Sequence, residues 1–225
     1  AILNELQNKE RNIVTLEDPV ELRLEGTRQS QIRTEKGFTF AVGMRSILRQ
    51  DPDVMMIGEI RDPETAEYAM RASLAGRIVF STVHANSSIG TIARLLDMKV
   101  ERSLIAYAIN GIISKRLVRK NCDGCRERYT PESQYLEYFG FDLKAHEFTR
   151  GKGCNSCGGT GYMGRLGLFE VLEFDDRVRN LIIDETSMSA LQEHIEKSGL
   201  KTLKQDAIEK VLAGLTTLEE VARAV

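Results

Sequence analysis

Three apolar runs in this sequence each end in side chains that can carry out acid–base or metal chemistry. The runs lie at residues 13–16, 54–57 and 78–80. The reactive side chains that follow them are Glu17 and Asp18, Glu59 and Arg61, and His84. Such short runs are typical of buried parallel strands, and open α/β sheets bind ligands at the carboxyl ends of their strands. We therefore predict that these groups meet at one edge of a sheet, where an acid coordinates a metal or orients water.

Each run taken alone also fits a core strand followed by a solvated turn, so the prediction depends on the repetition and on the segment between the second and third runs. That segment, 62–76, predicts a helix, because Asp62 suits the N-cap, Pro63 the first turn and Gly76 the position just past the end. A strand, a crossover helix and a second strand together predict a right-handed parallel unit.

The four cysteines form a second chemical pattern. They stand as two C-x-x-C pairs, Cys122 with Cys125 and Cys154 with Cys157. Two such pairs present four thiolates on tight turns, as a tetrahedral structural zinc ion requires. Disulfides, an iron–sulfur cluster and a redox dithiol are the alternatives. The nearby cations that we expect to offset the thiolate charge are Lys115, Arg116, Arg119, Lys120, Arg126, Arg128 and Lys152.

The composition and the remaining segments predict a globular α/β protein. The chain has 225 residues and a net charge of -2, so it can bury one core with a small appended module and gives no reason to expect nucleic-acid binding. No apolar segment approaches the length that spans a bilayer. Alternation at 164–174 predicts a pair of strands. Helical spacing predicts helices at 177–183, 189–197, 202–213 and 217–225, with Gly199 and Gly214 as C-caps.

Three stretches of the chain resemble the motifs of a known family. They are TLEDPVE at 15–21, LRQDPDVMMIGEIRD at 48–62 and STVHAN at 81–86. In order and spacing they are similar to the Asp box, the Walker B motif and the His box of the secretion ATPase superfamily. The chain resembles in particular the assembly ATPases of type II secretion, type IV pili and competence pseudopili, over essentially its whole length.

The resemblance implies a RecA-like P-loop NTPase core with a tetracysteine zinc module and a C-terminal helical region. The implied domains are a partial ATPase core at 1–120, the zinc-binding module at 121–160 and a strand pair with a helical subdomain at 161–225. The Walker A loop G-x-x-x-x-G-K-[ST] of this family does not occur in the sequence. The opening AILNELQNKE resembles the latter half of the helix that follows that loop. We therefore expect a fragment that by itself binds ATP weakly and hydrolyses it negligibly.

The resemblance also implies roles for individual residues, with ATP, Mg²⁺ and Zn²⁺ as the bound groups. Glu17 would activate water and Glu59 would hold magnesium, although the two roles are exchangeable on sequence alone. His84 would contact the region of the γ-phosphate. The remaining groups expected to contact nucleotide or Mg²⁺ are Asp18, Arg49 and Arg61. Ion pairs of the two arginines with Asp51, Asp53 or Asp62 are the alternative.

The partners implied by the resemblance are five further copies of the chain, in a homohexamer, and an inner-membrane platform protein with other components of the machinery. The location implied is the cytoplasm, at the inner membrane through these partners, without membrane insertion. A reducing compartment favours zinc over disulfides, and the tetracysteine module favours assembly ATPases over retraction ATPases. Because Walker A is absent, a non-catalytic zinc-bearing interaction module of such a machine is the alternative function.

Overall fold

The computed structural model describes residues 2–6, 10–142, 146–184 and 188–225. Two compact units make up the chain. The first consists of Ala1–Ile112 and Glu173–Ile195, and the second of Ile113–Leu172 and Glu196–Val225. Both units are therefore discontinuous in sequence, and the division into three domains stays a prediction.

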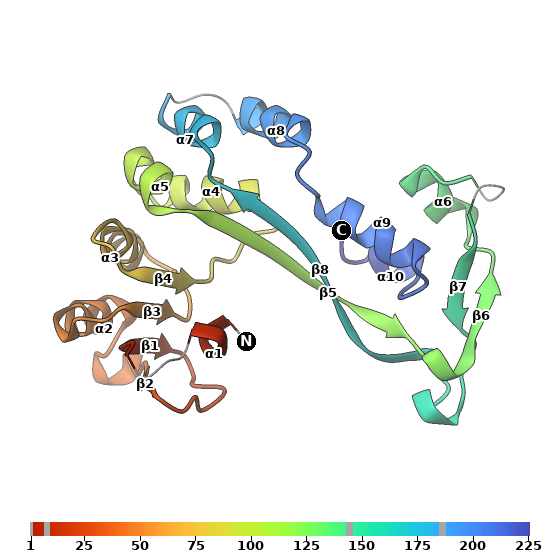
Figure 1. The fold of residues 1–225 in the computed structure, drawn as a ribbon, viewed down its shortest axis with the longest axis horizontal. Coiled ribbons are helices and arrows are strands. Elements are labelled where there is room, and N and C mark those ends of the chain that lie inside the picture. Colours follow the sequence, from red (N-terminus) through yellow and green to blue (C-terminus); the bar gives the residue numbers. More distant parts are fainter. Residues whose placement is uncertain (1, 7–9, 143–145, 185–187) are drawn as a thin grey trace. The chain divides into compact units, whose positions relative to one another are not determined.

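The first unit contains a four-stranded parallel sheet (Figure 1). Its order is β2-β1-β3-β4, with the strands at Ile13–Glu17 for β1, Thr27–Gln31 for β2, Val54–Ile57 for β3 and Ile78–Ser81 for β4. The register pairs Leu16 with Ile57 and Ile57 with Ser81. The carboxyl ends of β1, β3 and β4 therefore lie at the same level of the sheet. The three predicted strands are thus confirmed, and they are neighbours in one sheet.

The first unit also contains helices. They are α1 (Ile2–Leu6), α2 (Phe40–Ile47), α3 (Pro63–Leu74), α4 (Ser88–Asp97), α5 (Arg102–Ala108), α7 (Asp176–Ile183) and most of α8 (Met188–Lys197). Helix α3 begins as predicted, because Oδ1 of Asp62 accepts a hydrogen bond of 2.8 Å from the backbone N–H of Thr65. Gly76 follows its end with a φ of 90°. The first ten residues, expected to resemble the latter half of a helix, are helical at 2–6. Residues 1 and 7–9 lie outside the described residues.

The second unit is built on two two-stranded sheets (Figure 1). Strand β5 (Gly111–Asn121) pairs with β8 (Tyr162–Glu173), and β6 (Arg126–Tyr129) forms an antiparallel pair with β7 (Phe148–Gly151). Helices α6 (Ser133–Phe139), α9 (Leu203–Leu212) and α10 (Leu218–Ala222) complete the unit. Its core includes Val118, Leu168, Val211, Leu218 and Val221, all buried.

The prediction of a strand pair at 164–174 is wrong. Residues 164–173 lie in the single strand β8, whose partner β5 comes much earlier in the chain, and Phe174 follows the strand. The prediction failed because apolar alternation identifies extended backbone but does not identify the pairing partner. The four predicted C-terminal helices are confirmed as α7, α8, α9 and α10, although α10 is shorter than expected. In the described part of the chain, no helix is both long and apolar enough to cross a membrane.

Two glycines of the second unit touch backbone to backbone beside the cysteines. A Cβ atom at Gly161 would lie 2.1 Å from the carbonyl oxygen of Gly151, far inside van der Waals contact. Gly161 also has a φ of 77°, in the left-handed region that glycine favours. The close approach matters locally, because the carbonyl of Gly161 accepts a hydrogen bond of 2.9 Å from the backbone N–H of Cys122.

Replacing Gly161 with Ala is expected to lower the free energy of unfolding by more than about 2 kcal/mol, since the backbones must move apart. The matched control is Gly158→Ala. Gly158 has a similar φ of 60°, but an added Cβ would meet nothing within 4 Å. The control is expected to cost about 1 kcal/mol, the strain of a left-handed L-residue. Thermal unfolding of the two variants measures the difference, and equal losses would contradict the close-contact argument.

Candidate nucleotide site and tetracysteine cluster

The segments after β3 and β4 continue the hydrogen-bonded ladder of the sheet beyond the strands themselves. The backbone N–H of Gly58 donates to the carbonyl of Leu16 at 2.7 Å, and that of Ile60 donates to the carbonyl of Thr82 at 2.9 Å. The chain on both sides of Glu59 is therefore held between its two neighbours. This pairing fixes where an acid at the end of β3 points.

Glu59 is the centre of a polar group at this edge. Its carboxylate is buried, with 8% of the residue exposed. Oε2 lies 3.2 Å from Nε2 of His84, and Oε1 forms an ion pair with the guanidinium of Arg61. Arg61 also lies 3.8 Å from Oδ2 of Asp18. The hydrogen bond to Glu59 is the main cause that raises the pKa of Arg61 above its ordinary value.

Glu17 is the last residue of β1, which pairs with β3, the strand that Glu59 follows. Glu17 is buried, with 9% of the residue exposed. Its Oε1 accepts hydrogen bonds from the hydroxyl of Thr15 at 2.5 Å and from Nε2 of Gln29 at 2.9 Å. Sequence reasoning missed both donors. Gln29 lies in the polar segment TRQSQ of β2, which carries no apolar pattern, so its place beside Glu17 becomes visible only when β1 and β2 pair.

Arg49 lies away from this group. It is exposed in the 3-10 turn Leu48–Gln50, which precedes β3, whereas Glu59 follows that strand. A four-residue strand spans about 13 Å, so the structure does not bring Arg49 to the other predicted residues, and its role stays a prediction.

The alternative ion pairs, of Arg49 or Arg61 with one of three nearby aspartates, are not the ones that the structure shows for Arg61. Among the described residues, Arg61 pairs with Glu59 and Asp18. Asp62 instead caps α3, Asp53 accepts from the backbone N–H of Asn12 at 2.7 Å, and Asp51 lies 3.7 Å from Arg77.

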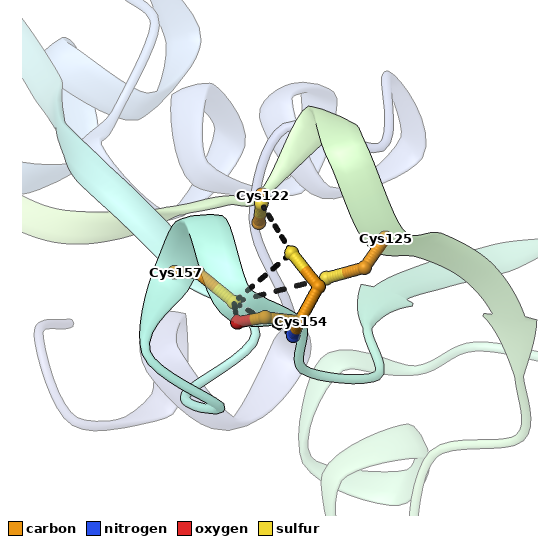
Figure 2. A group of neighbouring side chains, drawn as sticks. All are labelled: Cys122, Cys125, Cys154 and Cys157. Atoms are coloured by element: carbon orange, nitrogen blue, oxygen red, sulfur yellow. Dashed lines mark hydrogen bonds between the residues drawn. The ribbon is translucent and has the colours of Figure 1, made fainter.

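The four cysteines meet in the second unit (Figure 2). Cys122 precedes a 3-10 turn that ends at Cys125, and Cys154 precedes another that ends at Cys157. All four Sγ atoms lie within 4.8 Å of one another, with separations of 3.9, 3.9 and 3.7 Å for three of the pairs. A tetrahedral zinc ion with Zn–S bonds of about 2.3 Å requires sulfur separations of about 3.8 Å. A disulfide would need about 2.05 Å, and the cysteines are free. The donor set and its spacing therefore fit zinc.

The surroundings of the sulfur atoms differ from one cysteine to another. The backbone N–H groups of Cys154 and Gly161 donate to Sγ of Cys157 at 3.2 and 3.3 Å, and the first of these is the main cause that lowers the pKa of Cys157 to about 6. Burial raises the pKa of Cys125 to about 12. Backbone amides thus favour one thiolate, as they do at many anion sites.

Several of the cations expected to offset the thiolate charge pair with carboxylates instead. Lys120 and Arg126 both bind Asp123, which lies between the first two cysteines. Two further pairs join Arg119 to Glu220 and Arg128 to Glu147. Apart from the cysteine thiols themselves, the donors to sulfur among the described residues include the backbone N–H groups of Cys154 and Gly161.

A parallel α/β sheet with acids and a histidine along its carboxyl edge, together with a tetracysteine cluster, defines a protein with the fold of secretion and pilus motor ATPases. The chain belongs to the family described as Type II/IV secretion system protein, which matches residues 1–223. The resemblance seen in the sequence is therefore confirmed.

Individual relatives agree with this assignment. The chain is 46% identical to the type II secretion system protein E of Pseudomonas aeruginosa, over 99% of this chain and 44% of that protein. It is 41% identical to the type IV pilus assembly ATPase PilB of Thermus thermophilus, over 98% of this chain and 25% of that protein. The chain thus spans less than half the length of either relative.

Among solved structures, the crystal structure of the pilus retraction motor PilT with bound ADP is similar. The TM-score is 0.69 at 28% identity, and the likeness covers 100% of this chain and 55% of PilT. The predicted α/β fold class is confirmed by this match and by the tetracysteine cluster.

Proposed function

We propose that this chain is the ATPase region of a hexameric motor that couples ATP hydrolysis to the assembly of type II secretion pseudopili or type IV pili. The observation that carries the proposal is the group at the sheet edge, where buried Glu59 contacts Arg61 and His84, with Glu17 on the adjacent strand. Carboxylates, a cation and an imidazole in this arrangement suit phosphoryl transfer, in which the protein mainly positions groups and stabilises charge. The names of the relatives support the choice of machinery.

In this proposal each residue has a stated role. Glu59 and Asp18 hold Mg²⁺, which neutralises charge on the transferred phosphate when it is bound. Glu17 orients the attacking water and accepts its proton. His84, whose side chain is 87% exposed, hydrogen-bonds the γ-phosphate region, and Arg61 supplies positive charge beside it.

The tetracysteine cluster has a structural role in the proposal. Cys122, Cys125, Cys154 and Cys157 hold Zn²⁺ in a site with four protein ligands and no open position. With zinc bound, the four cysteines would join the turn before β6 to the turn between β7 and β8. The wider proposal is a homohexamer in the cytoplasm that meets the inner membrane through a platform protein.

A second candidate is a non-catalytic zinc-bearing interaction module of the same machinery. The observation that favours it is the lack of G-x-x-x-x-G-K-[ST] in the 225 residues. Without that loop, the backbone amides, lysine and hydroxyl that bind phosphates and magnesium in such ATPases must come from elsewhere.

Magnesium-dependent ATP turnover separates the two candidates. The 225-residue chain is assayed beside the extended protein, meaning the full product of the gene that encodes this chain. We expect turnover by the extended protein alone, because the 225-residue chain has no G-x-x-x-x-G-K-[ST] loop of its own. Turnover by neither form would favour the interaction module, and turnover by the shorter chain would contradict the expected need for upstream residues.

A further inference from the structure

One oxygen of the Glu17 carboxylate is held by two donors from neighbouring strands. Thr15, fully buried in β1, and Gln29, opposite Thr15 on β2, both donate to Oε1. Strands β1 and β2 are neighbours in the sheet of the first unit (Figure 1). Oε2 forms no hydrogen bond with any residue in the described ranges. Two hydrogen bonds to one oxygen orient the carboxylate and leave the other oxygen free to accept a proton.

The amide of Gln29 is itself fixed in one orientation. Its Oε1 accepts a hydrogen bond of 2.9 Å from the backbone N–H of Leu24, and its Nε2 donates to the carbonyl of Leu22, also at 2.9 Å. A backbone N–H only donates and a carbonyl only accepts, so these two contacts decide which end of the amide faces Glu17. The side chain therefore presents a fixed N–H donor to the carboxylate and cannot turn its oxygen toward it.

We propose that Gln29 is a positioning residue of the ATPase site, which acts through Glu17. With Thr15 it holds Oε1, so that Oε2 faces the attacking water. Oε2 takes a proton from that water while the water oxygen bonds to the γ-phosphorus, and the bond from this phosphorus to the bridging oxygen of ADP breaks. The inference rests on the proposed ATPase function and on Glu17 as the base. Position matters here because a shift of about 1 Å in a reacting group can cost about 100-fold in rate.

The first test is Gln29→Met in the extended protein. Met matches the length of Gln but has no N–H to donate, so kcat is expected to fall about 10- to 100-fold. The KM for ATP and the affinity for a fluorescent ATP analogue, measured by equilibrium titration, are expected to stay within about twofold, because Gln29 does not contact nucleotide in the proposal. The matched control is Gln50→Met, at an exposed glutamine in the turn before β3, which is expected to leave all three values unchanged.

A second variant separates positioning of Glu17 from tethering of the loop at 22–24. Thr15→Val removes the other donor to Oε1 and leaves the contacts of Gln29 with Leu22 and Leu24 in place. We expect the same pattern, a lower kcat with unchanged nucleotide affinity. If Gln29→Met lowers kcat and Thr15→Val does not, the loop is what matters and the inference is wrong.

A double-mutant cycle with Glu17→Gln gives the decisive readout, because coupled residues are non-additive and a general structural defect is additive. In the Glu17→Gln background, Gln29→Met is expected to change kcat by less than about twofold. If the fold-losses in kcat of the two single variants multiply fully in the double variant, the inference is overturned. If the extended protein hydrolyses ATP and Gln29→Met retains its kcat, the positioning role fails and the ATPase proposal stands. If the extended wild type does not hydrolyse ATP, both fail.

Discussion

Replacing Glu59 with Gln is expected to lower the magnesium-dependent ATP turnover of the extended protein by at least about 100-fold. Gln matches Glu in shape but has no negative charge. The variant would therefore bind Mg²⁺ poorly, and it would leave the guanidinium of Arg61 without its main partner at the sheet edge. Phosphate release measured at saturating ATP, over a range of magnesium concentrations, checks both effects.

The same substitution at Glu64 is the matched control. Glu64 lies in the first turn of α3, with its side chain 54% exposed, and it lies 3.9 Å from the guanidinium of Arg45. Glu64→Gln is expected to keep turnover within about twofold, since exposed ion pairs contribute little. If Glu59→Gln retains more than about a tenth of wild-type turnover, Glu59 is not the metal-holding acid, and Glu17→Gln should be tested for that role instead.

Replacing Cys122 with Ser is expected to remove zinc from the 225-residue chain and to lower its thermal unfolding midpoint by about 10 °C or more. Three thiolates bind zinc less tightly than four. Because the site forms only when the chain folds, the lost binding energy is lost folding energy. Zinc content by inductively coupled plasma mass spectrometry and unfolding by scanning calorimetry give the two readouts.

The control for this variant is Ser156→Ala, at an exposed residue between Cys154 and Cys157 that offers no thiolate. It is expected to retain one zinc per chain and the wild-type midpoint. Thiol titration after chelation at neutral pH is expected to find four reactive thiols per chain, in agreement with free cysteines. Finding none would support the disulfide alternative. A wild type that contains no zinc as purified, or a zinc-loaded wild type that unfolds at the same temperature as Cys122→Ser, would refute the structural metal.

Local signals in the sequence were sufficient for the elements that carry the candidate site. The apolar run of β3 and the Asp62 cap of α3 are properties of adjacent residues, and both were found within a residue or two of their true bounds. Strand β2 was not predicted, because TRQSQ has no apolar pattern and is extended only through its hydrogen bonds with β1. The pairing of β8 with β5 was missed for the same reason, since strand partners are chosen through space.

The sequence by itself determined which reactive groups follow each strand, the order of those strands along the chain and the four cysteines available to a metal. The tertiary structure alone decided their partners. It placed Arg61 against Glu59 and not Asp62, brought Gln29 to Glu17, and set the sulfur atoms at separations that suit zinc. The physical reason is that hydrogen bonds and metal coordination act over about 2–3 Å. At that range, strand pairing and turn geometry decide which side chains meet, whatever their separation in sequence.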